Sequence, residues 1–313
     1  MRARGLRALL RGLCCAAIIH AGAAAAGADA LPVTQIAAGV YVYAGAQADA
    51  SPANRGAIAN IGFIVGGGCV AVIDTGGSPA VGRALRNAVR NVTPLPICYV
   101  INTHVHPDHI FGNAAFRADR PEFVGHAKLA AAMNARARAY LAALKHTLGP
   151  DAADAEIIAP TRAVTGSATV DLGDRKLRLR AWPSAHTDHD LTVFDELTET
   201  LWLSDLLFVE RIPVVDGSLP GWLKVLSELK GMAAKRVVPG HGRVAADWPE
   251  IAAEQERYLQ RLLTETRAAL RARKTLQEAV DTVGGGERDR WLLFDAYHRR
   301  NVTAAFAELE WEE

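Results

Sequence analysis

The chain has 313 residues, of which half are hydrophobic and 22% are charged, and its formal net charge is +1. This composition is typical of a soluble globular protein with a substantial core, and the length fits one large domain with a small appendage. Because Lys and Arg are scattered along the chain and form no basic patch, we expect no nucleic-acid partner.

Residues 1–30 have the pattern of a secretory signal peptide. Four arginines precede an apolar segment, residues 13–26, which is too short for a comfortable membrane span, and small residues follow it. Cleavage after Ala28 and cleavage after Ala30 fit the pattern equally, and an uncleaved N-terminal anchor is the alternative. We therefore expect a periplasmic or secreted protein with no membrane partner after signal removal.

The first part of the mature chain predicts a β-hairpin followed by a strand–helix–strand unit, after a short linker and an initial strand. Strands are expected at residues 39–43, 61–65, 69–74 and 98–103, and a helix is expected at residues 81–92. This order brings residues 103–109 to the carboxyl end of a strand, which is the edge where open α/β sheets place their sites.

Two cysteines, Cys69 and Cys98, remain in the mature chain, and each begins one of these strands. If the strands are parallel neighbours, the two cysteines lie at the same level, five residues before Asp74 and Thr103. A disulfide in an oxidising compartment is therefore a hypothesis, although buried free thiols are the state we expect.

The run Thr103-His104-Val105-His106-Pro107-Asp108-His109 contains three imidazoles and a carboxylate. His104 and His106 are two residues apart, so in extended backbone they point to the same side and can bind one cation. Pro107 allows the chain to turn there and to present Asp108 and His109 as a second ligand pair. Imidazole with carboxylate suits zinc, iron or manganese better than calcium. The run predicts the first half of a two-metal site, and a chance cluster of histidines in a polar loop is the alternative.

Asp74 follows a predicted strand and precedes a predicted helix, and two interpretations are open. It could be an ordinary helix N-cap. It could instead brace the metal loop by accepting a hydrogen bond from a ligand histidine or a backbone N–H.

The middle of the chain separates the two halves of the candidate site. A helix from His126 to about residue 148 and a loop at residues 149–165 could form a substrate lid or wall. His126 and His146 lie at the two ends of this helix without a metal-type partner beside them, so we expect structural or surface roles for both.

Further strands and closing helices are predicted downstream, and the polar residues again follow strands. The strands are expected at residues 168–170, 176–182, 191–194, 201–205 and 236–241, the helices at 249–273, 274–283 and 288–310. His186 lies in the loop at residues 183–190, while Asp205 and His241 end their strands.

Together, His104-x-His106-x-Asp108-His109, His186, Asp205 and His241 make the chain resemble the metallo-β-lactamase superfamily over nearly all of residues 35–245. The resemblance implies an α/β fold, an αββα sandwich (metallo-β-lactamase fold) with C-terminal helices. It implies a domain over residues 31–248 and a helical extension, residues 249–313, packed on the same domain. Segments 101–116, 205–208 and 221–223 are most similar to the SoxH-like branch, the quinoprotein relay system zinc metallohydrolases, which implies a possible quinoprotein dehydrogenase partner.

The resemblance also implies a role for each member of the motif. His104, His106 and His186 would hold metal 1, Asp108, His109 and His241 would hold metal 2, and Asp205 would bridge the two. Two Zn²⁺ ions are expected, with iron or manganese as alternatives. A metal-bridging hydroxide would attack an acyl carbonyl, and Asp108 would be catalytic by orienting this nucleophile or passing a proton.

Some residues depart from the pattern of dedicated β-lactamases. Asp205 stands where some lactamases have cysteine or serine, which favours a glyoxalase-II-like or SoxH-like arrangement. Phe208 replaces a lysine that binds a substrate carboxylate in one lactamase class. Arg211 or Lys224 could serve instead, although a solvated surface charge is the commoner role for such residues. His189 could line the pocket or lie at the surface.

We therefore predict an exported dinuclear zinc metallohydrolase that acts on a small-molecule ester, thioester or lactam. Two alternatives differ in chemistry. One is a mononuclear iron enzyme similar to persulfide dioxygenases, and the other is a periplasmic accessory or binding protein of a quinoprotein dehydrogenase system. Seven candidate ligands favour two metals over one iron, and they exceed the four closed ligands that a purely structural zinc needs.

Overall fold

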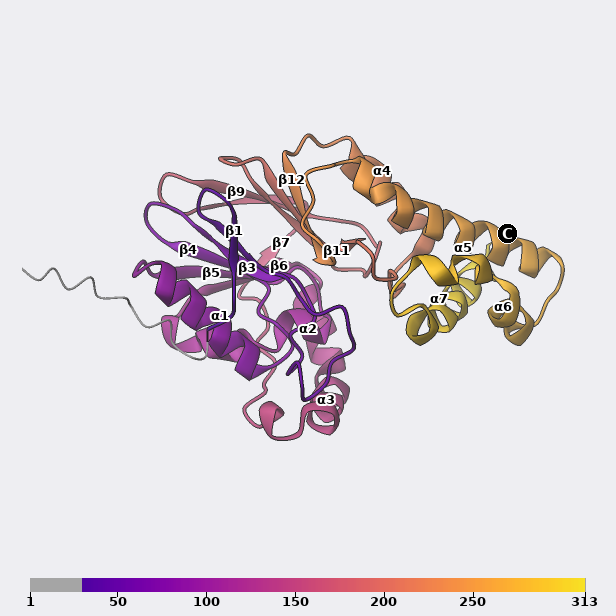
Figure 1. Cartoon of the computed structure of the whole chain (residues 1–313), viewed down its shortest axis with the longest axis horizontal. Coiled ribbons are helices and arrows are strands. Elements are labelled where there is room, and N and C mark those ends of the chain that lie inside the picture. Colours follow the sequence, from indigo (N-terminus) through magenta and orange to yellow (C-terminus); the bar gives the residue numbers. More distant parts are fainter. Residues whose placement is uncertain (1–29, 313) are drawn as a thin grey trace, which may run out of the picture.

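The computed structural model describes residues 30–312, so the predicted signal peptide, apart from its last residue, lies outside the described residues. Two β-sheets face each other, and helices lie outside them (Figure 1). Within residues 30–312, no helix combines the length and the apolar character that a membrane span requires.

The first sheet has seven strands, whose order in space is the order in the chain. Its first four strands pair antiparallel, and its last four pair parallel. The strands are β1 (Thr34–Ala37), β2 (Val40–Tyr43), β3 (Ile61–Val65), β4 (Val70–Ile73), β5 (Ile97–Ile101), β6 (Glu122–His126) and β7 (Arg162–Val164).

The second sheet has five strands in the order β12-β11-β10-β9-β8, and only the β11–β12 pair is parallel. Its strands are β8 (Ser167–Asp171), β9 (Lys176–Ala181), β10 (Leu191–Asp195), β11 (Thr200–Phe208) and β12 (Arg236–His241). Apolar and charged side chains alternate along β9, so that one face of this strand is buried between the sheets. Leu177 and Leu179 face the first sheet, whereas Arg178 and Arg180 point outward.

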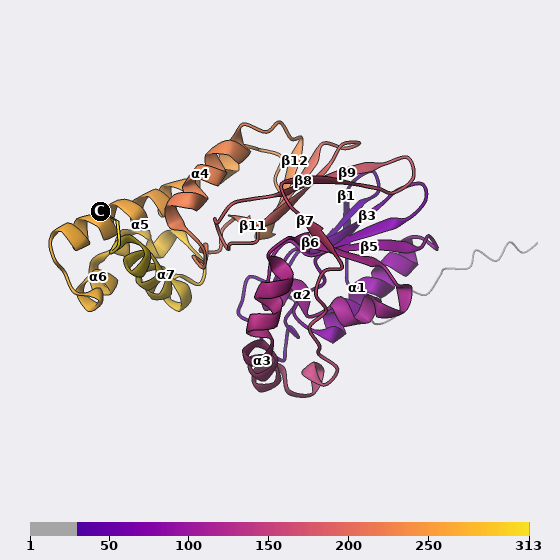
Figure 2. The same cartoon turned by 180° about the vertical axis from the view of Figure 1, so that it is seen from behind.

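Helices cover the outer faces of both sheets. The α-helices are α1 (Pro79–Val92), α2 (Pro107–Ile110), α3 (Leu129–Leu148), α4 (Leu219–Lys230), α5 (Ala253–Arg271), α6 (Leu276–Thr282) and α7 (Phe294–Leu309). The views in Figures 1 and 2 agree that α1, α2 and α3 lie on one side of the paired sheets, and that α4 lies on the other.

Hydrophobic spacing explains why these helices pack where they do. In α1, Val81, Leu85 and Val89 recur on one face and pack on the outer face of the first sheet. In α4, Trp222 and Leu226 pack on the second sheet, in a cluster that also contains residues of α5 and α7. The chain therefore forms the α/β, αββα sandwich that the resemblance implied.

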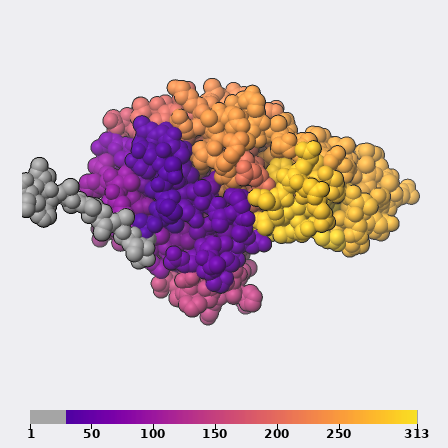
Figure 3. All heavy atoms as spheres, viewed as in Figure 1, coloured from indigo at the N-terminus to yellow at the C-terminus, as the bar shows by residue number. Residues whose placement is uncertain are grey.

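The helices that follow residue 248 extend the molecule to one side and also reach back toward its N-terminal part. In Figure 3 the yellow C-terminal atoms touch the indigo atoms of the early loops. A hydrogen bond from the hydroxyl of Tyr297, in α7, to the carboxylate of Asp49 joins the two parts. Residues of α7 consequently come within reach of the edge where the predicted ligands lie.

Several element boundaries differ from the prediction. Residues 34–37, expected as a linker, form β1, and part of the loop expected at 149–165 forms β7. The strand expected to end on Asp205 continues to Phe208. Ser204 has a positive φ of 48°, and the pairing of β11 with β12 shifts at this residue, so Asp205 turns toward the site from within a strand.

Cys69 and Cys98 form a disulfide, so the expectation of free thiols was wrong. The reason lies in the parallel pairing of β4 with β5, which sets Val70 opposite Ile97 and leaves the two cysteines 5.8 Å apart between Cα atoms. This separation lies in the usual range for a disulfide. The bond ties together the two strands that lead to Asp74 and to residues 103–109.

Candidate metal centre

The seven predicted ligands lie together at the edge where β5, β11 and β12 end or turn. They divide into two groups, and within each group the potential ligand atoms all lie within 4.8 Å of one another. The first group is His104, His106, His186 and Asp205, and the second is Asp108, His109 and His241.

The first group presents three imidazole nitrogens to one point. His106 Nδ1 lies 3.1 Å from His104 Nε2 and 3.0 Å from His186 Nε2. These nitrogen–nitrogen contacts have the spacing expected of ligands that surround one cation, because a cation can accept the lone pairs of all three imidazoles.

The second group combines one carboxylate with two imidazoles. Asp108 Oδ2 lies 3.3 Å from His241 Nε2 and 3.6 Å from His109 Nε2. Nitrogen and oxygen donors in this arrangement suit zinc, iron or manganese.

Asp205 lies between the two groups. Its Oδ1 is 3.1 Å from His109 Nε2, and its Oδ2 is 3.4 Å from His186 Nε2 and 3.6 Å from both His104 Nε2 and His241 Nε2. One carboxylate thus approaches imidazoles of both groups, which is the position that a bridging ligand requires.

Two buried atoms of the cluster have no hydrogen-bond partner among residues 30–312. These are His109 Nε2 and Asp205 Oδ1, which face each other without making a hydrogen bond. Leaving buried polar atoms unpaired is costly. Cations held between the donors would satisfy both atoms, so the residues present fit a metal centre.

The ring nitrogen that faces away from the cluster has a fixed partner in all five histidines. For His104 this partner is the hydroxyl of Thr103, 3.1 Å from Nδ1. His109 Nδ1 is 2.8 Å from Asp74 Oδ2, and His106 Nε2 is 3.0 Å from Asp216 Oδ2. His186 Nδ1 and His241 Nδ1 donate to the carbonyl oxygens of Val214 and Ile58, at 2.7 and 2.9 Å. Such partners fix each ring and leave the inward nitrogen free to bind metal.

Asp74 braces the metal loop and does not cap the following helix. Its carboxylate accepts hydrogen bonds from the backbone N–H and the hydroxyl of Thr103, at 2.8 and 2.7 Å, besides its contact with His109. The N-cap of α1 is Ser78, whose hydroxyl accepts from the N–H of Val81. Of the two interpretations that the sequence left open, the structure selects the second.

Gly240 makes room for the carboxylate between the two groups. A Cβ atom at this position would lie 1.8 Å from Asp205 Oδ1. Because no real Cβ contact is that short, a larger residue would displace the carboxylate, and the glycine in the Pro239-Gly240-His241 run is a requirement of the site.

Burial and the neighbouring charges set the protonation of the cluster. Burial lowers the pKa of His104 well below its usual value and lowers the pKa of His186 to about 3. Burial alone would raise the pKa of Asp205, but the imidazoles of His109, His241 and His104 hold it well below its usual range. Against the opposing effect of burial, the neighbouring carboxylates, Asp205 foremost, raise the pKa of His109 well above its usual value and raise that of His241. Neutral imidazoles and ionised carboxylates are the forms that bind metal cations, so His109 and His241 would release a proton on metal binding.

Other residues singled out by the sequence lie elsewhere. His146 and Lys224 are exposed, and His126 is partly buried with Nδ1 accepting the N–H of Lys128. His189 is fully buried and contacts the hydroxyl of Thr187, so the surface interpretation was wrong. Arg211 is also buried, beside the centre, so the expectation of a solvated surface charge was wrong for this residue.

Sequence reasoning found Asp74 but missed the other groups that orient the ligands. Val214 and Ile58 act through backbone carbonyls, which carry no residue signature, and Asp216 lies in a loop that no motif marks. Tyr297 and Arg300, which line the cavity at the centre, belong to α7, and the amphipathic pattern of that helix gave no sign of this role.

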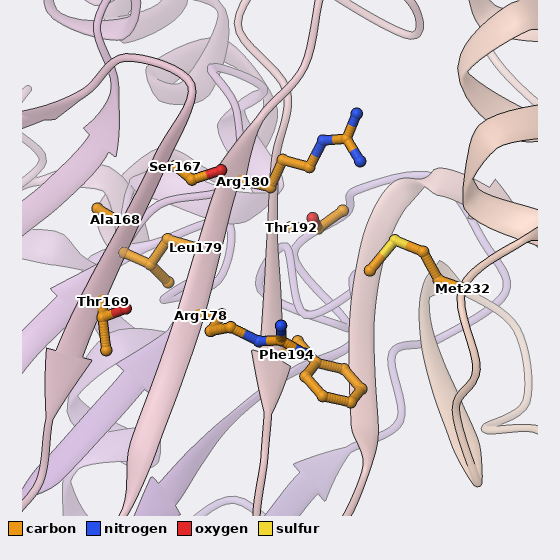
Figure 4. Close-up of a pocket in the computed structure, with 9 residues that line it drawn as sticks. All are labelled: Ser167, Ala168, Thr169, Arg178, Leu179, Arg180, Thr192, Phe194 and Met232. Atoms are coloured by element: carbon orange, nitrogen blue, oxygen red, sulfur yellow. The ribbon is translucent and has the colours of Figure 1, made fainter.

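A cavity of about 280 Å³ opens onto the cluster, and Asp108, Asp205 and His241 are among its lining residues. It adjoins a second cavity of about 340 Å³, since both share Ile58, Tyr140 and Tyr297 in their walls. A third cavity, of about 370 Å³, lies on the outer face of the five-stranded sheet, between Arg178, Arg180 and Met232 (Figure 4). None of the cluster residues lines this third cavity.

The fold and the cluster agree with comparisons to known proteins. Residues 54–241 match the family described as the metallo-beta-lactamase superfamily, and the chain therefore belongs to that superfamily. No curated protein matches the chain.

Solved structures show the same fold at low sequence identity. The chain is similar to TMB-1 (17% identity, TM-score 0.57, covering 74% of this chain and 97% of that one) and to a metallo-beta-lactamase from Pontibacter korlensis (18%, 0.55, 73% and 98%). It is also similar to the sec-alkylsulfatase Pisa1 from Pseudomonas sp., with 16% identity and a TM-score of 0.68 over 88% of this chain. The chain spans about half the length of that sulfatase.

Proposed function

We propose that the protein is an exported dinuclear zinc metallohydrolase that acts on a small ester, thioester or lactam. The observation that carries this proposal is the pair of donor groups joined by Asp205, in which two buried ligand atoms, His109 Nε2 and Asp205 Oδ1, have no hydrogen-bond partner within residues 30–312. Two bound divalent cations would supply Lewis acidity and would lower the pKa of water toward neutrality.

The residues around the cations would orient the reacting groups. Asp108 lines the cavity, and the imidazoles of His109 and His241 keep its pKa below the usual range against the opposing effect of burial. An ionised Asp108 could therefore accept a proton from the attacking nucleophile and pass it to the leaving group. Asp205 would keep the two cations at a fixed separation.

The number of donors supports two metals over one. A single iron held by two histidines and an aspartate would leave four of the seven ligands without a role, whereas both groups here are complete. The accessory-protein alternative has no comparable observation in its favour, and a quinoprotein dehydrogenase partner and a place in the SoxH-like branch stay predictions.

Export is supported by the disulfide. Cys69 and Cys98 are bonded, and disulfides persist mainly in oxidising compartments such as the periplasm. We therefore propose a periplasmic or secreted location, in line with the signal pattern at residues 1–30.

The test is a hydrolysis screen of the zinc-loaded protein against nitrocefin, lactoylglutathione and simple aryl esters. We expect turnover of at least one class, and its loss in His106→Ala, which removes a donor of the first group. A fully metallated protein that turns over none of these substrates would contradict the proposal and favour an accessory role.

A further inference from the structure

The second cavity, of about 340 Å³, adjoins the cavity at the candidate metal centre, and its walls are mostly apolar. The side chains of Phe111 and Leu144 in its wall are buried and belong to one hydrophobic cluster. The ring of Tyr140 packs near that of Phe111, with 6.5 Å between the ring centres. A concave, largely apolar cavity of this size is typical of a site for a small molecule.

The charged residues in the wall of the second cavity are acidic. Among residues 30–312, its lining includes two carboxylates, Asp49 and Asp108, and no lysine, arginine or histidine. The hydroxyl of Tyr297 donates a hydrogen bond to Asp49, which holds the early loop against α7. An anionic group would lose its hydration in this cavity and would meet no basic side chain in the wall, so the cavity suits an uncharged apolar group.

Asp108 lies at the boundary between the two cavities, because it lines both. Asp205 and His241 line the first cavity and are absent from the wall of the second. Leu144 and Thr147 line the second cavity and are absent from the wall of the first. A molecule that reacts at the donor groups and extends into the second cavity therefore passes beside Asp108.

The role proposed for Asp108 determines which part of the substrate passes beside it. Hydrolysis adds water to the acyl carbon, breaks the bond from that carbon to the leaving oxygen or sulfur, and moves one proton from the water to the leaving atom. If Asp108 carries this proton, the leaving atom lies beside its carboxylate. The group attached to the leaving atom then extends toward the second cavity, and the acyl group stays in the first.

We propose that the second cavity binds an uncharged apolar group on the leaving side of the scissile bond, so that the substrate is an ester or thioester of an apolar alcohol or thiol. Helix α3 supplies Tyr140, Leu144 and Thr147 to this wall, and α7 supplies Tyr297. Helices outside the two sheets thus set the substrate preference. This inference rests on the proposed hydrolase function and narrows its substrate class.

The test compares two isomeric esters, benzyl acetate and methyl phenylacetate, which carry the same phenyl group on opposite sides of the ester bond. We expect kcat/KM of the zinc-loaded protein for benzyl acetate to exceed that for methyl phenylacetate by about tenfold or more. Acid release at constant pH measures both reactions. Equal values, or a preference for methyl phenylacetate, would overturn the inference.

A matched pair of variants on α3 assigns the preference to this cavity. Thr147 and His146 are neighbours and are both exposed, but only Thr147 lines the second cavity. Thr147→Trp should fill part of the cavity and lower the ratio of the two kcat/KM values by about fivefold or more, whereas His146→Trp should keep the ratio within about twofold of the wild type. An unchanged ratio in Thr147→Trp would overturn the inference, because the preference would then arise elsewhere.

Binding of an uncharged fluorophore separates failure of the inference from failure of the hydrolase proposal. A protein that holds two metals but hydrolyses neither these esters nor the substrates of the hydrolysis screen contradicts the hydrolase proposal by itself. In that case, N-phenyl-1-naphthylamine tests the apolar cavity without any reaction. We expect its Kd to rise by about tenfold in Thr147→Trp and to stay unchanged in His146→Trp, and equal affinities in both variants and the wild type would overturn the inference.

Discussion

Each histidine of the candidate metal centre directs one ring nitrogen to the cluster, and most direct the other to a fixed acceptor in the protein. Asp74 is the acceptor with the most contacts, because it holds both Thr103 and His109 and is fully buried. It also has a positive φ of 53°, a backbone conformation that is uncommon outside glycine and that concentrates at functional sites. Single residues outside the ligand set thus determine the geometry of the ligands.

Asp74→Asn should weaken the second metal group selectively. The amide can accept at only one of its two positions, so His109 or Thr103 loses its acceptor, and we expect metal affinity at this group to fall by about 10- to 100-fold. Competition with a chromophoric chelator measures the loss. Ser78→Ala is the control, because losing this cap of α1 should cost about 1 kcal/mol of stability without changing metal affinity. Equal metal affinity in Asp74→Asn and wild type would contradict the bracing role.

Asp190 predicts a pH dependence of stability. Its carboxyl is buried, accepts two hydrogen bonds from Thr187, and has a pKa that burial raises to about 8. The folded state therefore keeps a proton that the unfolded state loses near pH 4. This stabilisation is complete below about pH 4 and is lost as the pH rises toward 8.

Asp190→Asn, which cannot ionise, isolates this contribution. Between pH 5 and 8, the free energy of unfolding of the wild type should fall relative to the variant by roughly 1 kcal/mol per pH unit. Urea denaturation at several pH values measures the difference, and two parallel curves would show that Asp190 is charged in the folded protein.

At the scale of secondary-structure elements, α7 contacts the loop that orients the first metal group. Asn301 in α7 accepts a hydrogen bond from the N–H of Val215 and donates to the carbonyl of Pro213, at 3.0 and 2.7 Å. The residue between them, Val214, accepts the hydrogen bond of His186 Nδ1. Asn301 thus helps to position a metal ligand from outside the cluster.

Asn301→Ala should loosen this loop and lower the affinity of the first metal group more than that of the second. Removing the side chain leaves a buried N–H and a buried carbonyl without this partner, which costs about 1 to 3 kcal/mol each. Metal stoichiometry after dialysis against a weak chelator is the readout. Thr303→Ala, at an exposed position of the same helix, should have no effect. Equal loss of both metals would indicate general unfolding instead of a positioning role.

Much of the sandwich and of its ligand set could be predicted because both depend on local patterns. His104, His106, Asp108 and His109 follow a strand directly, and their spacing fixes which side chains share a cation. Asp205 was correctly predicted as a member of the ligand set, but it lies within a strand and not at the end of one. The left-handed conformation of Ser204 allows this buried strand to direct the Asp205 side chain to the site. Single-residue backbone conformations of this kind leave no hydrophobic pattern.

Long-range contacts were beyond prediction for a different reason. The burial of Arg211 depends on Tyr297, which lies 86 residues away in the chain, and the disulfide depends on the register between β4 and β5. Neither the amphipathic pattern of a helix nor the start of a strand specifies which distant side chain will lie against it.

At the scale of the whole molecule, the disulfide links two central strands of the first sheet. Cys69 and Cys98 are 29 residues apart, and closing a loop of that length stabilises a protein by about 3.6 kcal/mol in the chain-entropy model. We expect the free energy of unfolding to fall by roughly this amount in Cys69→Ala/Cys98→Ala. Non-reducing peptide mapping should recover the two cysteine peptides linked, and recovery of both as free thiols would contradict the bond.

The centre also connects the layers of the molecule, because its ligands come from both sheets and the groups that orient them come from the loops and from α7. Asp205 in β11 and His241 at the end of β12 belong to the second sheet, whereas His104 to His109 follow the first. Bound metal should therefore stabilise the packing of the two sheets as well as the site, in proportion to metal affinity.

Elemental analysis of the purified, dialysed protein tests the central claim most directly. We predict two equivalents of transition metal per chain, with zinc as the main element, because two complete donor groups share Asp205. A folded protein that retains no transition metal after zinc loading would contradict the metal centre, and one equivalent that cannot be raised by added zinc would contradict the dinuclear site.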